Sequence, residues 1–178
     1  MNSNLRDKIF NIKNQSDFIN IALQVYDYQH NENTVYQSFA NHLKKKSGSI
    51  TTLTEIPFLP VELFRNHKVI TGDKPVEKIF ESSGTTGNLT GRHYVCDLDL
   101  YTESFVKSFR LFYGDPEDYM IAALLPSYTE RENSSLVFMV DALIKMSRNR
   151  LSGFYREHEE ALIHNIITAR ETGKKVLL

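Results

Sequence analysis

The run YMIAALLP, Tyr119–Pro126, constrains the fold more than any other stretch of the chain. An unbroken apolar segment of this length, bounded by turn residues, is typical of a strand that is buried on both faces of a sheet. Such strands occur mainly in parallel sheets that are covered by helices on both sides. We therefore expect a layered α/β region around this run.

Strand-like and helix-like segments alternate around this run, which predicts a parallel or mixed sheet with flanking helices. Further strands are expected at 76–80, 92–96 and 153–155, with the start of another at 176–178. Apolar spacing predicts helices over 97–114, 135–146 and 157–173. Gly114 is expected to end the first of these helices and Gly173 the last. The side chains expected to face inward in those two helices are Leu98, Tyr101, Phe105, Phe109 and Phe112, then Leu162, Ile163, Ile166 and Ile167.

The first part of the chain is expected to be helical. Ser16 is the predicted N-cap of a helix, and a second helix is predicted over 34–43. Their expected inward positions are Phe18, Ile21, Ala22, Val25 and Tyr26, then Val35, Phe39 and Leu43. Pro57 should hold Ile56 in an extended conformation, and Pro60 should begin a short helix.

Composition excludes several classes of protein. The 178 residues are enough for a sizeable core, and 41% hydrophobic with 24% charged residues is ordinary for a globular chain. A formal net charge of −1 gives no basic field for nucleic acid or anionic membrane. The single cysteine, Cys96, excludes an internal disulfide and fits a reducing compartment. Because no apolar segment reaches membrane length and no signal peptide is evident, we expect a cytoplasmic protein.

The segment ESSGTTGNLTGR, residues 81–92, is the strongest functional candidate. Glycines let backbone N–H groups approach a phosphate closely, and hydroxyls add further donors. The candidate phosphate-binding residues are Ser82, Ser83, Gly84, Thr85, Thr86 and Gly87. The lysine of the common phosphate loop does not follow Gly87, and the dinucleotide spacing of glycines is absent. The alternative interpretation is a hairpin or surface turn, since Ser, Thr, Gly and Asn all favour turns.

This segment resembles the signature loop of adenylate-forming enzymes, the superfamily of acyl-CoA ligases, luciferases and adenylation domains. Two further stretches, IPFLPVELFRNHKV and ALLPSYTERENSSLVFMVDALIK, extend the similarity over residues 56–145. Together, the three stretches resemble acyl-protein synthetases of the LuxE type, also called long-chain-fatty-acid–protein ligases. The resemblance implies the N-terminal subdomain of an adenylate-forming enzyme. We accordingly divide the chain into a helical region, 1–75, and an α/β nucleotide-binding region, 76–178, within one continuous domain that ends early.

The resemblance implies a ligase that activates a long-chain fatty acid with ATP and Mg²⁺ as acyl-adenylate, then transfers the acyl group to a protein cysteine thiol. An acyl-CoA reductase is the implied protein partner, and no side chain is expected to ligate a metal. The lysine that usually follows the loop is missing, so Arg92 is the candidate catalytic cation. The later motifs and the acceptor cysteine of this family have no counterpart before Leu178, so we expect this chain alone to be inactive. The alternative function is a non-catalytic module that binds a nucleotide or acyl group, or docks the reductase.

A second candidate segment is PSYTERENSS, residues 126–135. By resemblance, Ser127, Tyr128, Ser134 and Ser135 line the acyl or adenylate pocket. The alternative is a helix entry with Ser134 as N-cap and a solvated loop before it.

Two histidine-containing segments are weaker candidates. His93, Cys96 and Asp97 lie on one expected strand, where 93 and 96 face opposite sides, so they are not expected to converge on a metal. Cys96 is expected to pack as a buried strand residue. His158 and His164 are six positions apart and do not share a helix face as zinc-protease histidines do. Glu160 and His164 are four apart and are expected to form a solvated pair.

Overall fold

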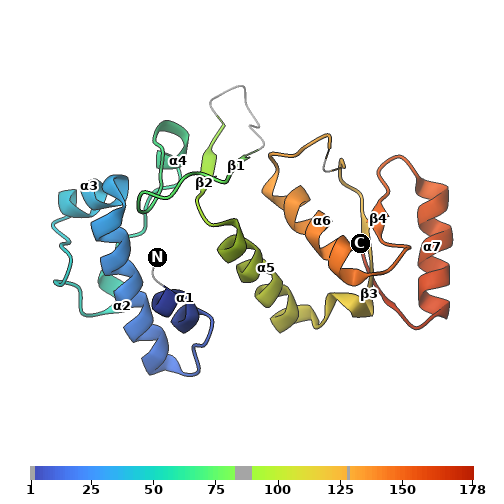
Figure 1. Cartoon of the computed structure of the whole chain (residues 1–178), viewed down its shortest axis with the longest axis horizontal. Helices are drawn as coiled ribbons and strands as arrows, with labels where there is room; N and C mark the ends of the chain where they lie inside the picture. Colours follow the sequence, from blue (N-terminus) through green and yellow to red (C-terminus); the bar gives the residue numbers. More distant parts are fainter. Residues whose placement is uncertain (1–2, 83–89, 128) are drawn as a thin grey trace. The chain divides into compact units, whose positions relative to one another are not determined.

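The computed structural model describes residues 3–82, 90–127 and 129–178. The elements shown in Figure 1 follow in the order α1 (Ser3–Ile9), α2 (Gln15–Glu32), α3 (Thr34–His42), η1 (Leu53–Glu55), α4 (Leu63–Asn66), β1 (Lys78–Glu81), β2 (Arg92–Val95), α5 (Leu98–Tyr113), η2 (Pro116–Asp118), β3 (Tyr119–Ala123), α6 (Ser135–Ser147), β4 (Gly153–Phe154), α7 (Glu159–Glu171) and β5 (Lys175–Leu177). Contacts divide the chain into two units, Met1–Leu100 and Tyr101–Leu178, each with its own hydrophobic core. The β1–β2 pair falls in the first unit, with the N-terminal helices, whereas the sequence interpretation grouped it with residues 76–178.

Helix α2 begins at a different cap from the one predicted. The side chain of Asn14 accepts a hydrogen bond from the backbone N–H of Asp17 at 2.9 Å, which satisfies a donor of the first turn. Ser16 lies inside that turn, so its prediction as the N-cap was wrong. Of the side chains expected to face inward, Ile21 and Tyr26 are buried, but Phe18 is exposed.

Helix α3 spans nearly the predicted residues. Asn33 caps its N-terminus by accepting from the backbone N–H of Tyr36 at 3.0 Å, and the helix ends at His42. Leu43 is exposed rather than inward-facing, because it lies beyond the last helical turn.

The core of the first unit lies between α2 and α3. Tyr26, Tyr36 and Ile50 form its buried centre, and the two tyrosine rings meet edge to face with centroids 6.0 Å apart. The Tyr36 hydroxyl donates to the carbonyl of Pro57 at 2.7 Å, which ties the segment after η1 to α3. The Tyr26 hydroxyl is buried and finds no hydrogen-bond partner among the described residues.

The proline-containing segment is partly as expected. Ile56 is extended, as Pro57 predicted. Pro60 does not begin a helix: its carbonyl accepts from the N–H of Leu63 in a turn, and α4 starts only at Leu63.

Strands β1 and β2 form a separate two-stranded sheet. They pair antiparallel, from Lys78↔Val95 to Glu81↔Arg92. Both strands were predicted within two residues, but they form a sheet of their own rather than part of the expected parallel or mixed sheet. Residues 82–91 are too few for a crossover between parallel strands, which needs roughly a dozen or more residues. They therefore connect the two strands of a hairpin.

The second unit contains the predicted parallel sheet. Its strand order is β4-β3-β5, and β3 pairs in parallel with both neighbours. All five residues of β3 are buried, which confirms the prediction from the apolar run. The second unit is thus a small α/β unit, and the chain as a whole is mixed α/β.

The two faces of β3 contribute to two cores. Tyr119 and Ile121 pack with Phe109 of α5 and Leu143 of α6. Met120 and Ala122 lie on the opposite face with side chains of α7, namely Leu162 and Ala169. The alternation follows from the period of two in a strand, and Figure 1 shows α6 and α7 on opposite sides of the strands.

Three further side chains predicted to face inward, in α5 and α7, are exposed. Phe112 is 77% exposed at the end of α5, and Ile163 and Ile167 of α7 are 61% and 52% exposed. The sheet covers only a narrow face of each helix, so the buried stripe of α7 is formed by Leu162 and Ala169, with Ile166 partly buried beside them. The stop of α5 at Gly114 is confirmed, because this glycine has φ +91° and donates to the Arg110 carbonyl at 3.1 Å.

Candidate functional site

The base of the 82–91 connection is closed by a reciprocal pair of hydrogen bonds. The N–H of Ser82 donates to the carbonyl of Gly91 at 3.0 Å, and the Ser82 hydroxyl accepts from the N–H of Gly91 at 2.9 Å. Space at Gly91 is limited, since a Cβ there would lie 3.4 Å from the Ser82 oxygen. The first and last residues of the connection are therefore held together.

The other predicted residues of this loop, Ser83, Gly84, Thr85, Thr86 and Gly87, lie outside the described residues. Their role in binding phosphate stays a prediction. Ser82 alone of the six is described, and its hydroxyl oxygen takes part in closing the connection.

Arg92 is exposed and engaged with neighbours on the hairpin. Its Nε lies 3.3 Å from a carboxylate oxygen of Glu81, the residue opposite it in the register. Hydrogen bonding to Tyr94, and then to Glu81, raises the pKa of the Arg92 guanidinium above its usual value. Arg92, the predicted catalytic cation, is thus already ion-paired with the Glu81 carboxylate.

Helix α4 lies beside β2 (Figure 1). The ring of Phe64 meets the ring of His93 edge to face, with centroids 6.3 Å apart. The side chain of Arg65 runs alongside Gly91, with its Cγ 3.8 Å from the position that a Cβ on Gly91 would take. The sequence resemblance included this segment, but it gave no role to Arg65.

The segment after β3 forms a compact polar turn. Ser127 donates to the Glu130 carboxylate through its N–H at 2.6 Å and its hydroxyl at 2.9 Å. These bonds, the backbone one first, together with the charge of Arg156, lower the pKa of Glu130. The Ser127 hydroxyl also lies 3.0 Å from that of Thr129. Tyr128 lies outside the described residues.

Ser134 and Ser135 lie at the start of α6. The Ser134 hydroxyl accepts from the N–H of Val137 at 3.4 Å, so this serine is the N-cap that the alternative interpretation predicted. Ser135 shares a hydrogen bond with the phenol of Tyr101, whose pKa is nevertheless raised because burial outweighs that bond. The Tyr101 ring contacts Phe105 and Phe138, which contact each other. An aromatic cluster therefore borders the start of α6.

The predicted site residues fall in different units. Ser82 and Arg92 belong to the first unit, whereas Ser127, Ser134 and Ser135 belong to the second. Within each unit the residues are close neighbours in sequence. Two further residues belong with the second group because they bond to its serines: Glu130 accepts from Ser127, and Tyr101 bonds to Ser135. The sequence alone placed Glu130 in a solvated loop and Tyr101 in the core.

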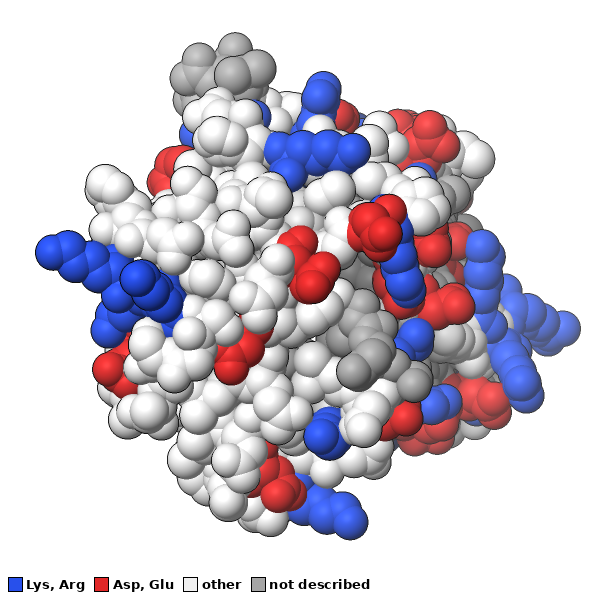
Figure 2. Space-filling view, turned by 60° about the vertical axis from the view of Figure 1, so that its left-hand side comes forward, with Lys and Arg blue, Asp and Glu red and all other residues white. Residues whose placement is uncertain are grey.

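Charged side chains are mixed on the surface. On the face in Figure 2, basic and acidic side chains are interspersed, in keeping with the net charge of −1. Among the described residues, no three His, Cys, Asp or Glu side chains are grouped so that they could hold a metal ion. Within the same part of the chain, no helix has the length and apolar character needed to cross a bilayer.

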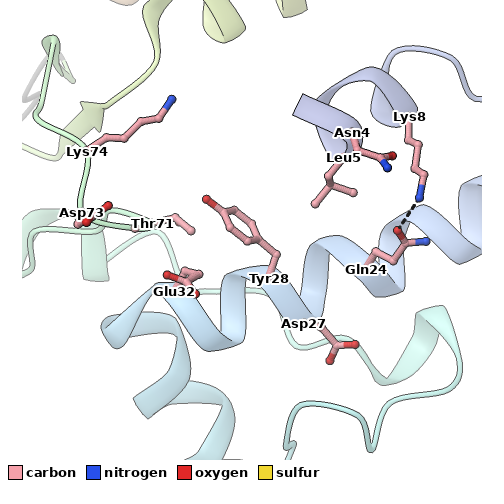
Figure 3. A pocket seen from close by; sticks show the side chains of 11 residues that line it. Asn4, Leu5, Lys8, Gln24, Asp27, Tyr28, Glu32, Thr71, Asp73 and Lys74 are labelled. Carbon is pink, nitrogen blue, oxygen red and sulfur yellow. Dashed lines mark hydrogen bonds between the residues drawn. The ribbon is translucent and has the colours of Figure 1, made fainter. Parts of the chain in front are cut away.

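A polar pocket of about 500 Å³ lies in the first unit between α1, α2 and the segment 71–74 (Figure 3). Tyr28 projects from α2 between Leu5 and Asp73, and burial, followed by the charge of Glu32, raises its pKa. Several polar groups of the pocket bind within the protein: Lys8 donates to Gln24 at 3.3 Å, Lys74 pairs with Asp97 at 3.2 Å, and Asp27 accepts from Ser47 and Gly48. Its lining mixes acids and bases and does not select one ligand charge.

The weaker candidates stay without a site. Cys96, just after β2, is half-buried rather than fully buried as expected. His158, Glu160 and His164 are all exposed. Comparisons of this chain with protein-family models, with curated proteins and with solved structures found no match.

Proposed function

We propose that the protein is an acid–thiol ligase that activates a long-chain fatty acid with ATP and passes the acyl group to a protein cysteine thiol. This chain would be the ATP-phosphate-binding part, within the N-terminal subdomain of an adenylate-forming enzyme. The observation that carries the proposal is the closed base of the 82–91 connection, where Ser82 and Gly91 hold together the two ends of the connection that contains SSGTTG. The side-chain stem of Arg65 in α4 (Cγ) lies beside Gly91.

The proposed reaction has two steps. A carboxylate oxygen of the fatty acid bonds to the α-phosphorus of ATP, and the bond from that phosphorus to the oxygen bridging to the β-phosphate breaks. Pyrophosphate leaves with the electron pair, and acyl-adenylate remains. A thiolate then attacks the acyl carbon, so that AMP leaves with the carbon–oxygen electron pair and a thioester forms. The thioester would serve an acyl-CoA reductase as partner.

Negative charge accumulates on the departing pyrophosphate, so the protein must provide donors and positive charge there before the reaction begins. Hydroxyls and backbone N–H groups of the SSGTTG segment are suited to the β- and γ-phosphates of ATP. Mg²⁺ would be carried by the phosphate oxygens, since no side chain is assigned to it.

The test is ATP–pyrophosphate exchange driven by long-chain fatty acids, with the protein encoded by the whole reading frame. The double variant Thr85→Ala, Thr86→Ala removes two hydroxyls of the loop and is expected to lower the exchange rate by about 10²-fold or more. The control variant, Thr168→Ala with Thr172→Ala, removes two threonine hydroxyls that bond to carbonyls of α7. It should exchange at the wild-type rate.

Exchange that is unchanged in the loop variant would remove the loop from the mechanism. Nucleotide binding by a wild-type protein that shows no exchange would contradict the activation chemistry and favour the non-catalytic binding module instead.

A further inference from the structure

We propose that Arg65 of α4, rather than Arg92 of β2, contacts the phosphate oxygens of ATP at the base of the 82–91 connection. This inference rests on the proposed function and deepens it, because it names the cation that takes the place of the missing loop lysine.

Helix α4 is fixed against the hairpin. The rings of Phe64 and His93 of β2 meet edge to face, and α4 and β2 are in contact. Arg65 follows Phe64 directly, so the anchored ring determines where the arginine side chain leaves the helix. The backbone position of Arg65 is therefore set relative to the strand that carries Gly91 and Arg92.

The stem of Arg65 packs where the connection rejoins β2. Its Cγ lies 3.8 Å from the Cβ position of Gly91, an ordinary van der Waals distance. The guanidinium begins at the atom after Cδ, so it can reach the closed Ser82–Gly91 pair from a stem that packs beside Gly91. A larger side chain at position 91 would collide with this stem. Both the Arg65 stem and the Ser82 hydroxyl therefore favour a glycine at this position.

The charge of Arg65 is available, whereas that of Arg92 is shared. Arg92 lies 3.3 Å from the Glu81 carboxylate. Within the part of the chain that the structure describes, Arg65 makes no ion pair with a carboxylate. A guanidinium without a carboxylate partner is suited to bind two phosphate oxygens at once through its planar fork.

The segment around Arg65 adds to the attraction for an anion. Residues 65–68 read RNHK and contain no acid, and all four are exposed. The ammonium of Lys68 lies 5.8 Å from the ring centroid of Tyr94, on the strand that carries Arg92. The Glu81 carboxylate, at the start of the connection, is already paired with Arg92.

The experiment compares variants of the whole-reading-frame protein by calorimetric titration with ATP and Mg²⁺, and by ATP–pyrophosphate exchange. Arg65→Met keeps an unbranched stem beside Gly91 and removes the charge; Arg65→Lys keeps the charge and removes the fork. Arg65→Met is expected to weaken ATP binding about 10- to 100-fold, the range for a lost bond to a charged group. Arg65→Lys should lie between Arg65→Met and wild type. Arg92→Met and the control Arg150→Met, at an exposed arginine of the second unit, should bind within about threefold of wild type.

Added salt supplies an independent readout, because the loss of a phosphate contact should reduce the dependence of ATP affinity on salt concentration in Arg65→Met. Wild-type affinity in Arg65→Met, in a protein that exchanges ATP, would overturn this inference alone. A larger loss in Arg92→Met than in Arg65→Met would overturn it too, by returning the role to Arg92. A wild-type protein that neither binds ATP nor exchanges would overturn the proposed function together with this inference.

Discussion

Two tyrosines in the core between α2 and α3 differ in one hydrogen bond. Both rings are buried and they contact each other, yet only the Tyr36 hydroxyl has a partner, the carbonyl of Pro57 at 2.7 Å. The Tyr26 hydroxyl has none among the described residues. A buried hydroxyl that has lost its water without gaining a partner destabilises the folded state, while a bonded one stabilises it modestly.

The same substitution should therefore have opposite effects at these two positions. Tyr36→Phe is expected to lower the free energy of unfolding by about 1 kcal/mol, and Tyr26→Phe to raise it by about 1 kcal/mol. Urea unfolding followed by circular dichroism measures both. Equal losses in the two variants would show that the Tyr26 hydroxyl has a partner that stabilises the fold.

Alkaline titration gives a second readout for Tyr36. Burial, and then the neighbouring Tyr26, raises its pKa to about 12, above the ordinary value of 10.0. The folded state holds the Tyr36 phenol proton more tightly than the unfolded chain does. The protonated phenol therefore contributes fully to the free energy of unfolding below pH 10, and this contribution is lost as the pH rises towards 12. The Tyr36→Phe protein should accordingly lose less stability than wild type over that range.

At the scale of elements, Ser134 at the N-terminus of α6 has two possible roles that can be tested separately. The Ser134 hydroxyl accepts from the N–H of Val137, and by resemblance Ser134 also belongs to the acyl or adenylate pocket. Ser134→Ala is expected to lower the free energy of unfolding by about 1 kcal/mol, and Ser134→Asp to restore it, because an aspartate caps as well as a serine. Chemical unfolding of the two variants measures this difference.

The control is Ser38→Ala at an exposed position of α3, which should change stability by less than about 0.5 kcal/mol. If Ser134→Asp were stable but inactive in fatty-acid-driven exchange, the hydroxyl would have a role beyond the cap. If Ser134→Ala were as stable as wild type, the cap would contribute nothing.

Elements were more predictable from the sequence than their pairing. The apolar run of β3 and the positive-φ glycine after α5 are local signals, and both were interpreted correctly. The partners of β1 and β2 depend on how the connection between them folds back, so an alternation of strands and helices suggested a parallel sheet where a hairpin exists. The exposed faces around Phe112 and Ile163 were assigned wrongly for a related reason: periodicity identifies an apolar stripe, but the width of the neighbouring sheet decides how much of it is covered.

The candidate site was predictable only in part. The string SSGTTG and the serines of 126–135 could be found because their residue types are unusual in sequence. Arg65 could not, because an arginine in a short helix has no distinctive pattern, and its relation to Gly91 arises from tertiary contact. The cap role of Ser134 was foreseen as an alternative, and the geometry agrees with it.

At the scale of the whole molecule, the two units should differ in local stability. Strand β3 is buried throughout and paired on both sides, whereas β1 and β2, among the residues that the structure describes, pair with each other alone. Backbone amides of 120–122 are expected to exchange with deuterium at least about tenfold more slowly than those of 79–80 and 93–94. Hydrogen exchange followed by mass spectrometry of the peptides measures this. Faster exchange in β3 than in the hairpin would mean that the parallel sheet is the less stable part.

The shared position of β3 has a consequence for how the chain can change in length. Tyr119 and Ile121 serve one core while Met120 and Ala122 serve the other. Inserting or deleting a single residue in β3 would turn each later side chain of the strand to the opposite face, so both cores would lose buried side chains. Residues 124–127 and 129–133, which follow, lie outside any helix or strand. Insertions and deletions among natural variants of this unit should therefore occur in that segment, while the length of β3 stays at five residues.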